Sequence, residues 1–265
     1  MTAQPPTVGH GAQSSVEGAR LLFLCGLHRS GTTLLARLLQ EHPAITGLSG
    51  TGAPMDEGQH IQSVYPSGSE FGGPGKFGFD VDSHMDETSD LATREAACRI
   101  LRGWAPYWET GADYCLEKSP TNLVRTRFLQ ALFPNATFIT IMRNPIVVAY
   151  ATQKWSRTSI SSLIEHWLLC HERFLEDKDR LYRSFQIRYE DLVADQPAVL
   201  SQIFSFLGLP EVSIAPMTKY GLNENYLKKW RRSCALPLMG WANRRTIRRF
   251  QTRVERFGYT LEPLQ

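Results

Sequence analysis

An apolar run that breaks into a glycine-bounded loop constrains the fold of this chain most. Residues 21–25 read LLFLC, the loop runs from Gly26 to Thr33, and an apolar helical pattern resumes at Leu34. A buried strand, a tight loop and a helix in this order predict an α/β fold with a parallel sheet. The loop places two glycines, three hydroxyls and one arginine at a helix N-terminus, where backbone N–H groups and the helix dipole attract anions. The segment therefore predicts a phosphate or sulfate site.

The loop differs from the P-loop of nucleotide triphosphatases in the position of its cation. Gly26 and Gly31 have the separation of that motif, but Thr32 stands where its lysine would be, and Arg29 lies earlier in the loop. Without that lysine on the phosphates, hydrolysis of ATP or GTP is disfavoured. Arg29 retains the planar fork that binds a terminal oxyanion. An ordinary strand-to-helix turn is the alternative, and it is less favoured because strand, glycines, cation and hydroxyls agree.

The loop also resembles that of a known family. Arg29-Ser30-Gly31-Thr32-Thr33 after a hydrophobic strand resembles the 5′-phosphosulfate loop of sulfotransferases, which use 3′-phosphoadenosine 5′-phosphosulfate (PAPS). The arginine form is most similar to tyrosylprotein and many bacterial sulfotransferases. The resemblance extends from about Leu21 to Trp230. It implies that residues 29–33 hold the 5′-phosphate and the sulfuryl group, with Arg29 also stabilising charge during transfer.

A second similarity follows the apolar run TFITIM at residues 137–142, which is typical of a buried parallel strand. The run ends in Arg143-Asn144-Pro145, and in the family R-x-P after a strand marks the 3′-phosphate site. The resemblance thus implies that Arg143 binds this phosphate; a salt-bridged surface arginine is the alternative. The family serine eight residues later is Ala151 here, which leaves Thr152 or a backbone N–H to replace it.

A third segment, Glu117-Lys118-Ser119, follows a short predicted strand and is similar to a stretch in heparan-type sulfotransferases. The resemblance implies that Lys118 stabilises charge on the transferred group; a surface Glu–Lys pair is the alternative. An acceptor hydroxyl also needs a base. Glu57, in the segment PMDEGQH, matches the base of the tyrosylprotein enzymes, and Glu117 matches that of the heparan-type enzymes. We favour Glu57, with Asp56 as a neighbour that would raise the pKa of one carboxyl.

Four further residues are weaker candidates for the site. The segment FQIRYE resembles one whose tyrosine contacts the nucleotide, which implies this role for Tyr189; a core tyrosine is the alternative. The segment YLKKW implies that Lys229 reaches the 3′-phosphate side, against a solvated basic helix face. His28 and His60 are less favoured bases, because a lone histidine in a polar loop is more often merely solvated.

The order of elements predicts a single α/β domain over residues 21–265, with a central parallel sheet flanked by helices as in P-loop nucleotide kinases. Strands are expected at 21–25, 114–116, 137–142 and 185–189. Helices are expected near 32–41, 88–108, 122–133, 145–155, 160–182, 191–207 and 242–257. Residues 47–83 hold nine glycines and predict an acceptor-binding lid, in which Tyr65, Phe71, Phe77 and Phe79 contact an acceptor or pin the loop to the core.

Composition limits the class of protein. Of the 265 residues, 42% are hydrophobic and 21% are charged, as in ordinary globular domains. A net charge of +3 is too small for a general nucleic-acid binder. The five scattered cysteines lack metal-ligand spacing, which favours reduced thiols in a cytoplasmic protein. Residues 1–20 lack an apolar core and are expected to form a disordered arm, and no apolar run is long enough to span a membrane.

These observations together favour a bacterial, PAPS-dependent sulfotransferase without a metal. The acceptor would be a hydroxyl or amine of a small molecule, lipid or carbohydrate, and its identity and the oligomeric state stay open. A small-molecule P-loop kinase is the alternative, and a non-catalytic nucleotide-binding domain is a third class. Residues 228–256 carry ten basic side chains against one acid. These would serve a polyanionic partner or, as we favour, pair with acids elsewhere.

Overall fold

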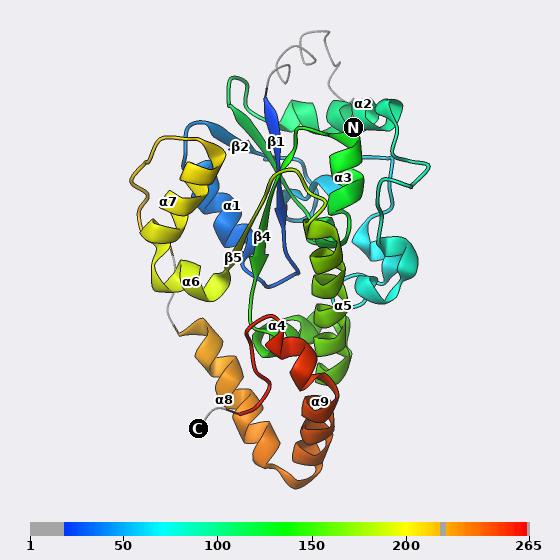
Figure 1. Ribbon diagram of the computed structural model, residues 1–265, viewed down its shortest axis with the longest axis vertical. Helices are drawn as coiled ribbons and strands as arrows, with labels where there is room; N and C mark the ends of the chain where they lie inside the picture. The colour runs from blue at the N-terminus through cyan, green and yellow to red at the C-terminus, as the bar shows by residue number, and fades with distance from the viewer. Residues whose placement is uncertain (1–18, 218–220, 264–265) are drawn as a thin grey trace, which may run out of the picture.

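The computed structural model describes residues 19–217 and 221–263, so the arm expected at residues 1–20 lies almost entirely outside the described residues. A five-stranded parallel sheet forms the centre of the molecule (Figure 1), in the order β2-β3-β1-β4-β5. The strands are β1 (Arg20–Cys25), β2 (Ile45–Gly47), β3 (Tyr114–Lys118), β4 (Thr137–Met142) and β5 (Ser184–Arg188).

Strand β1 is the point where the chain changes direction across the sheet. Strands β2 and β3 lie on one side of β1, and the chain then crosses to β4 and β5 on the other side. All strands are parallel, so their carboxyl ends meet at one edge. The register pairs Leu24 of β1 with Lys118 of β3, and Cys25 with Thr140 of β4. The loops that follow β1, β3 and β4 therefore converge where open α/β sheets bind ligands.

Helices cover both faces of the sheet (Figure 1). The alternation along β1 sends Leu22 and Leu24 into one core and Phe23 and Cys25 into the other. The helices whose residues share the first core are α1 (Thr32–Gln40), α6 (Tyr189–Ala194) and α7 (Gln196–Leu207). Those of the second core are α2 (Arg94–Trp104), α3 (Thr126–Leu132), α4 (Pro145–Ser156) and α5 (Ile160–Lys178).

The predicted fold class is confirmed, and the differences concern short or irregular elements. Strand β2 was missed because it has three residues and shows no alternation. The helix predicted at 88–108 begins only after Thr93, which caps its first turn, and those at 122–133 and 191–207 are each divided in two. Helix α9 (Pro237–Glu255) begins earlier than predicted, and α8 (Leu222–Ala235) was not predicted.

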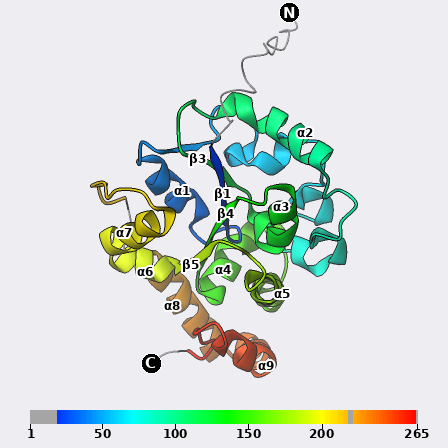
Figure 2. The ribbon, with the colours of Figure 1, turned by 45° about the horizontal axis from the view of Figure 1, so that its top comes forward.

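Helices α8 and α9 form a hairpin that projects beyond the sheet (Figures 1 and 2). Its base is fixed to the body through buried Trp230 of α8 and Phe250 of α9, which belong to the second core. The indole of Trp230 also donates to the carbonyl of Leu261 at 2.8 Å.

Residues 47–83 contain five short 3₁₀ turns and neither an α-helix nor a strand beyond Gly47. Of the four aromatic residues expected there, Tyr65 and Phe77 are buried in the second core, Phe71 is half-buried and Phe79 is exposed. The segment is thus anchored to the core by two of its aromatic side chains.

Within the described ranges, no helix is both long enough and apolar enough to cross a membrane. All five cysteines lie in those ranges and are free thiols, as expected.

Candidate active site

A solvent-open cleft of about 1350 Å³ lies at the carboxyl edge of the sheet, between the loop after β1 and helices α4 and α8. Of the predicted site residues, the structure brings the following to its wall: His28, Arg29, Gly31, Thr32, Thr33, Glu57, Arg143 and Tyr189. They come from four separate segments of the chain. The parallel topology therefore assembles most of the predicted site in one place.

The loop after β1 presents an uncapped helix N-terminus to this cleft. No side chain caps α1, whose first residues Thr32 and Thr33 line the wall. The hydroxyl of Ser30 is fully buried and has no hydrogen-bond partner among the described residues. Arg29 is exposed, and its guanidinium lies 4.8 Å from the ring centroid of Trp155. Open N–H groups, an unpaired hydroxyl and a solvated cation together form an anion-binding environment.

Backbone strain is concentrated around the cleft. Among the described residues, four non-glycine residues have positive φ, and three of them adjoin this site: Arg29 (67°), Met55 (57°) and Asp56 (50°). Such conformations cost on the order of 1–3 kcal/mol each and persist where surrounding structure enforces them. The three residues adjoin the loop after β1 and Glu57. Unfavourable backbone conformations of this kind cluster at active sites.

Gly31 is required by both conformation and space, which gives a test of the loop. Its φ is 100°, and a Cβ there would lie 2.5 Å from Cδ2 of Tyr189. Gly31→Ala is expected to lower the free energy of unfolding by about 2–4 kcal/mol, since the left-handed cost and the steric clash add. Urea denaturation measures this loss. Gly111→Ala is the matched control, because Gly111 has φ 89° and no atom near its would-be Cβ. Equal losses in the two variants would contradict the packing of Gly31 against Tyr189.

Arg143 is buried in the cleft wall beside the loop and has no carboxylate partner among the described residues. Its guanidinium donates to Oδ1 of Asn223 at 2.6 and 2.9 Å and to the carbonyl of Arg29 at 2.9 Å, and it stacks 3.9 Å above the Tyr189 ring. Within the described residues no ion pair forms with Arg143. Burial lowers the pKa of this guanidinium, which nevertheless stays charged. The salt-bridged surface arginine is thus not what the structure shows.

Asn223 holds Arg143 in place through a second layer of contacts. Its amide donates to Oε1 of Glu190 at 2.8 Å, and Tyr259 donates to Oε2 of the same carboxylate at 2.8 Å. The backbone N–H of Asn144 donates to that carboxylate as well, at 3.1 Å. The carboxylate of Glu190 therefore accepts hydrogen bonds from these three groups and contacts Arg143 only through Asn223. The charge of the Arg143 guanidinium remains available to a ligand in the cleft.

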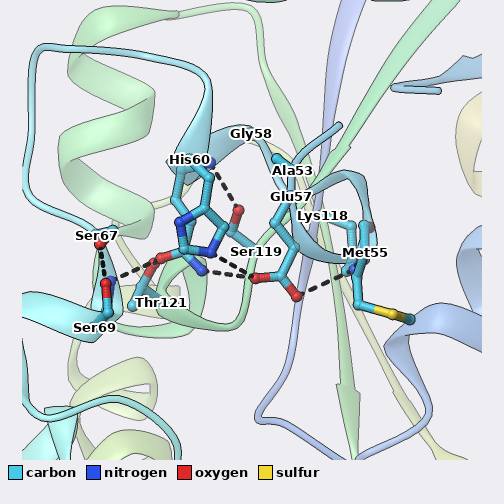
Figure 3. A network of polar contacts seen from close by, with 12 residues as sticks. Ala53, Met55, Glu57, Gly58, His60, Ser67, Ser69, Lys118, Ser119 and Thr121 are labelled. Carbon is cyan, nitrogen blue, oxygen red and sulfur yellow. Dashed lines mark hydrogen bonds and ion pairs between the residues drawn. The ribbon is translucent and has the colours of Figure 1, made fainter. Parts of the chain in front are cut away.

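Glu57 and Lys118 form a buried ion pair at the floor of the site (Figure 3), with Nζ 3.3 Å from Oε1. Lys118 also donates to the carbonyl of Met55 at 3.1 Å, and Gln59 donates to Oε2 of Glu57 at 2.7 Å. Nε2 of His60 lies 3.7 Å from the same carboxylate. Glu57 lines the cleft, whereas Lys118 lines an adjoining hollow that shares Thr33 and Met55 with it. Lys118 and Gln59 thus orient the carboxylate of Glu57, which lines the same cleft as the loop after β1.

Asp56 binds Thr51 and has a lowered pKa, whereas a raised carboxyl pKa was expected. Its Oδ1 accepts from the N–H and the hydroxyl of Thr51 at 2.9 and 2.6 Å. The hydroxyl and then the backbone hydrogen bond lower the pKa of Asp56. The spacing of adjacent carboxylates in the sequence was misleading because the positive φ of Asp56 turns it away from Glu57.

Glu117, the alternative base, is not part of the cleft. Its carboxylate is fully buried and accepts from the hydroxyl of Ser119 at 2.5 Å, the amide of Asn122 at 2.6 Å and the N–H of Gly58 at 2.9 Å. A Cβ at Gly58 would lie 2.6 Å from Cγ of Glu117. This carboxylate therefore ties the segment that carries Glu57 to strand β3.

Burial raises the pKa of Glu117 above its ordinary value of 4.5, against the lowering effect of its hydrogen bonds. The folded state then binds the proton more tightly than the unfolded state does. The stabilisation that comes from this tighter binding of the Glu117 proton is fully present below pH 4.5, and it is lost as the pH rises through the raised pKa of Glu117. Glu117→Gln is expected to flatten the fall of unfolding free energy above pH 4.5, measured by denaturation at a series of pH values. An unchanged slope, or the same change in the exposed control Glu95→Gln, would contradict this assignment.

Three predicted residues lie away from the cleft or are altered by burial. Thr152 is buried behind it, facing a small pocket with His166, while Ala151 occupies the cleft wall. Lys229 is exposed, with Nζ 4.7 Å from the ring centroid of Tyr150. His28 is at the wall, but burial and the nearby Lys118 lower its pKa to about 4. The imidazole is therefore neutral near pH 7 and a weak base.

Sequence reasoning missed several cleft residues: Leu34, Met55, Pro120, Trp155, Met217, Leu222 and Tyr226. Trp155 follows Ala151 by four residues on α4, and this spacing on one helix face was the available signal. Tyr226 and Leu222 come from α8, whose packing against the site is a long-range property.

Comparison with known proteins identifies the family of this chain. The model of the sulfotransferase family matches residues 22–213. Nodulation protein NoeE of Sinorhizobium fredii is 26% identical over 166 residues, which are 55% of this chain and 36% of that protein. Protein-tyrosine sulfotransferase 2 of Gallus gallus is 24% identical over 198 residues, which are 71% of this chain and 51% of that protein. The chain thus spans between one third and about half of these relatives.

Two solved structures share the fold. The sulfotransferase domain of a Synechococcus olefin synthase aligns with a TM-score of 0.53 at 19% identity, covering 91% of this chain and 96% of that one. The sulfotransferase domain of the curacin biosynthetic pathway aligns with a TM-score of 0.52 at 19% identity, covering 91% and 98%. With the family match over residues 22–213, these findings show that the chain belongs to the sulfotransferase family.

Proposed function

We propose that this protein transfers the sulfuryl group of PAPS to a hydroxyl or amine of a small-molecule, lipid or carbohydrate acceptor. The observation that carries the proposal is the presence of two arginines, Arg29 and Arg143, in the wall of one cleft. Arg29 stands beside the uncapped N-terminus of α1, and Arg143 is held by neutral oxygen acceptors. Two cations in one cleft, one at the helix N-terminus and one at the end of β4, suit a ligand with a 5′-phosphosulfate and a 3′-phosphate.

The residues present fit this co-substrate. The loop from Arg29 to Thr33 would hold the 5′-phosphate and sulfuryl oxygens, because Ser30 has a buried hydroxyl without a partner. Arg143 would hold the 3′-phosphate. Tyr189 packs under the guanidinium of Arg143 and also closes over Gly31, so it fixes the spacing between the two sites. Trp155 and Tyr226 add flat aromatic surface of the kind on which bases stack.

PAPS supplies the sulfuryl group: its bond from sulfur to the 5′-phosphate oxygen breaks, a bond from sulfur to the acceptor oxygen or nitrogen forms, and adenosine 3′,5′-bisphosphate (PAP) leaves. Glu57 accepts the acceptor proton in this scheme, since it lines the cleft and its carboxylate contacts Lys118. Lys118 holds Glu57 through a hydrogen bond and balances its charge. Arg29 and the α1 amides stabilise the negative charge that develops on the bridging oxygen.

Two predicted roles change in emphasis. Glu117 serves as the anchor of the Glu57 segment rather than as the base, because three donors occupy its oxygens. Thr152 is poorly placed to replace the family serine, because its hydroxyl is buried behind the wall, and the first N–H groups of α4 are already bonded to Asn144. Residues 47–83 carry Glu57 and Met55 to the cleft, which supports their role as the acceptor-side segment.

The proposal is tested with PAPS labelled with sulfur-35 and a panel of phenols, alcohols, amines and sugars. Label is expected in an organic product, with one PAP released for each sulfate transferred. Arg29→Ala is expected to abolish transfer, and Arg102→Ala, at an exposed position of α2 outside the cleft wall, is the control that retains it. Label transfer that persists in Arg29→Ala would contradict the site, and transfer of phosphate from ATP to the same panel would favour a kinase.

A further inference from the structure

The turn of the α8–α9 hairpin lies at one end of the molecule (Figure 1), and it carries a cluster of exposed apolar side chains. Leu236, Leu238, Met239 and Trp241 are 50%, 87%, 51% and 63% exposed. Single exposed apolar residues are ordinary on protein surfaces, but four within six positions form a patch that marks an interaction site. We call these four residues the apolar tip.

Arginines surround the apolar tip without acidic partners. Five exposed arginines lie within two or three turns of it: Arg231, Arg232, Arg244, Arg245 and Arg248. In residues 19–217 and 221–263 none of them forms an ion pair. We call these five residues the arginine collar.

The other two arginines of α9 have a structural role, because they pair with acidic residues of α5. Arg249 and Arg253 contact Glu165 and Glu172 of α5, each with Nη2 at 2.5 Å from a carboxylate oxygen. The expected pairing of this basic segment is thus confirmed on the face toward α5. The arginines of the collar take no part in these ion pairs, so their charge is available to a partner.

Helix geometry arranges the tip and the collar in layers. Leu238, Trp241, Arg245 and Arg248 are spaced by three, four and three residues, so they lie along one stripe of α9. A rise of 1.5 Å per residue places Arg245 about 10 Å from Leu238 along the helix. Arg231 and Arg232 end α8 about one turn before Leu236. The apolar tip therefore lies at the turn of the hairpin, and the arginine collar lies on both helices next to it, closer to the body of the molecule.

We propose that the apolar tip and the arginine collar dock this protein on the surface of an anionic lipid bilayer. Leucine, methionine and tryptophan enter the boundary of headgroups and acyl chains, where tryptophan is favoured. The arginines then lie at the depth of the lipid phosphates, with their apolar stems covered. A soluble polyanion would match the cations but leave Leu238 and Met239 without a partner, which favours the bilayer.

The same hairpin links this surface to the cleft. Leu222 and Tyr226, at the start of α8, line the cleft, and the apolar tip follows the end of the same helix. The 14 residues of α8 correspond to about 20 Å. Docking would therefore hold the cleft at a fixed distance of this order from the membrane surface.

The test is co-sedimentation of the full chain with vesicles of phosphatidylglycerol and phosphatidylcholine, compared with phosphatidylcholine alone. Binding is expected only to the anionic vesicles and should weaken as salt is raised. Arg245→Gln with Arg248→Gln is expected to lower the partition coefficient about fivefold per arginine. Leu238→Ser with Trp241→Ser is expected to lower it at least about tenfold. Val81→Ser and Tyr182→Ser, at residues that are each 80% exposed elsewhere, are the matched controls.

A brominated lipid supplies a second readout that depends on insertion. Quenching of tryptophan fluorescence by such vesicles is expected in the wild-type chain and should be absent in Trp241→Phe, which retains binding. Binding to heparin but not to vesicles would overturn the proposal in favour of a soluble polyanion. Dimers that dissociate in Leu238→Ser with Trp241→Ser, without vesicle binding, would overturn it in favour of a second copy of the chain.

Discussion

Glu57→Gln is expected to reduce kcat for sulfuryl transfer by about 10²–10⁴-fold, the usual contribution of a positioned general base. Glutamine keeps the size of the side chain, and its single carbonyl oxygen can accept one of the two hydrogen bonds that Lys118 and Gln59 donate to Glu57, so the affinity for PAP should change little. The loss should therefore appear in kcat rather than in the KM for PAPS. Steady-state kinetics with a responsive acceptor measure both constants.

The neighbouring carboxylate supplies the matched control for this substitution. Asp56→Asn changes the adjacent residue in the same way, but Asp56 is engaged with Thr51, and its loss should leave kcat within about twofold. Glu117→Gln should affect stability and its pH dependence more than turnover, because Glu117 is buried away from the cleft. A Glu57→Gln enzyme with near wild-type kcat, or a larger loss in Asp56→Asn, would contradict the role of Glu57.

Arg143→Ala is expected to weaken binding of PAP about 30- to 1000-fold, since it removes a buried cation from a charged ligand contact. Arg143→Lys should recover only part of this loss, because an ammonium lacks the planar fork that contacts Asn223 and the carbonyl of Arg29 together. Isothermal calorimetry gives the affinity, and thermal denaturation shows whether each variant is folded.

Lys229→Ala separates the roles of the two cations proposed for the 3′-phosphate. Lys229 is exposed over the ring of Tyr150 rather than at the cleft wall, so its loss should change PAP affinity by less than about fivefold. A folded Arg143→Ala variant that binds PAP as tightly as the wild-type chain would remove the 3′-phosphate site from the proposal.

The parallel sheet and the anion loop were accessible from sequence because their signals are local. LLFLC and TFITIM are long, continuous apolar runs, and the glycines of the loop fall at positions that need unusual backbone geometry, as the φ of Gly31 shows. Arg143 was accessible for the same reason, since it directly follows a recognisable strand. In a parallel sheet, position at the end of a strand predicts position in space.

Orientation within the site was less accessible. Glu57 and Glu117 both occur in plausible motifs, and only the structure shows that one carboxylate faces the cleft while the other is enclosed by Ser119 and Asn122. Thr152 stood beside the position of the family serine, but the 100° step between neighbours on α4 points it away from the cleft. Such differences depend on packing and on single backbone angles, which short sequence patterns do not encode.

The α8–α9 hairpin shows a third limit. Its basic composition was evident, but the pairing of Arg249 and Arg253 with α5 and the isolation of the arginine collar depend on which face of α9 meets the body. Composition predicted the total charge of this segment, and tertiary packing decides which part of that charge is available to a partner.

Titration of the wild-type chain with PAP in the absence of magnesium, with ATP and ADP in parallel, tests the central claim most directly because it requires no knowledge of the acceptor. The account predicts one binding site per chain, clearly tighter binding of PAP than of either nucleotide, and no gain on adding magnesium. Absence of PAP binding, or a magnesium-dependent preference for ATP, would contradict the assignment of this cleft to PAPS.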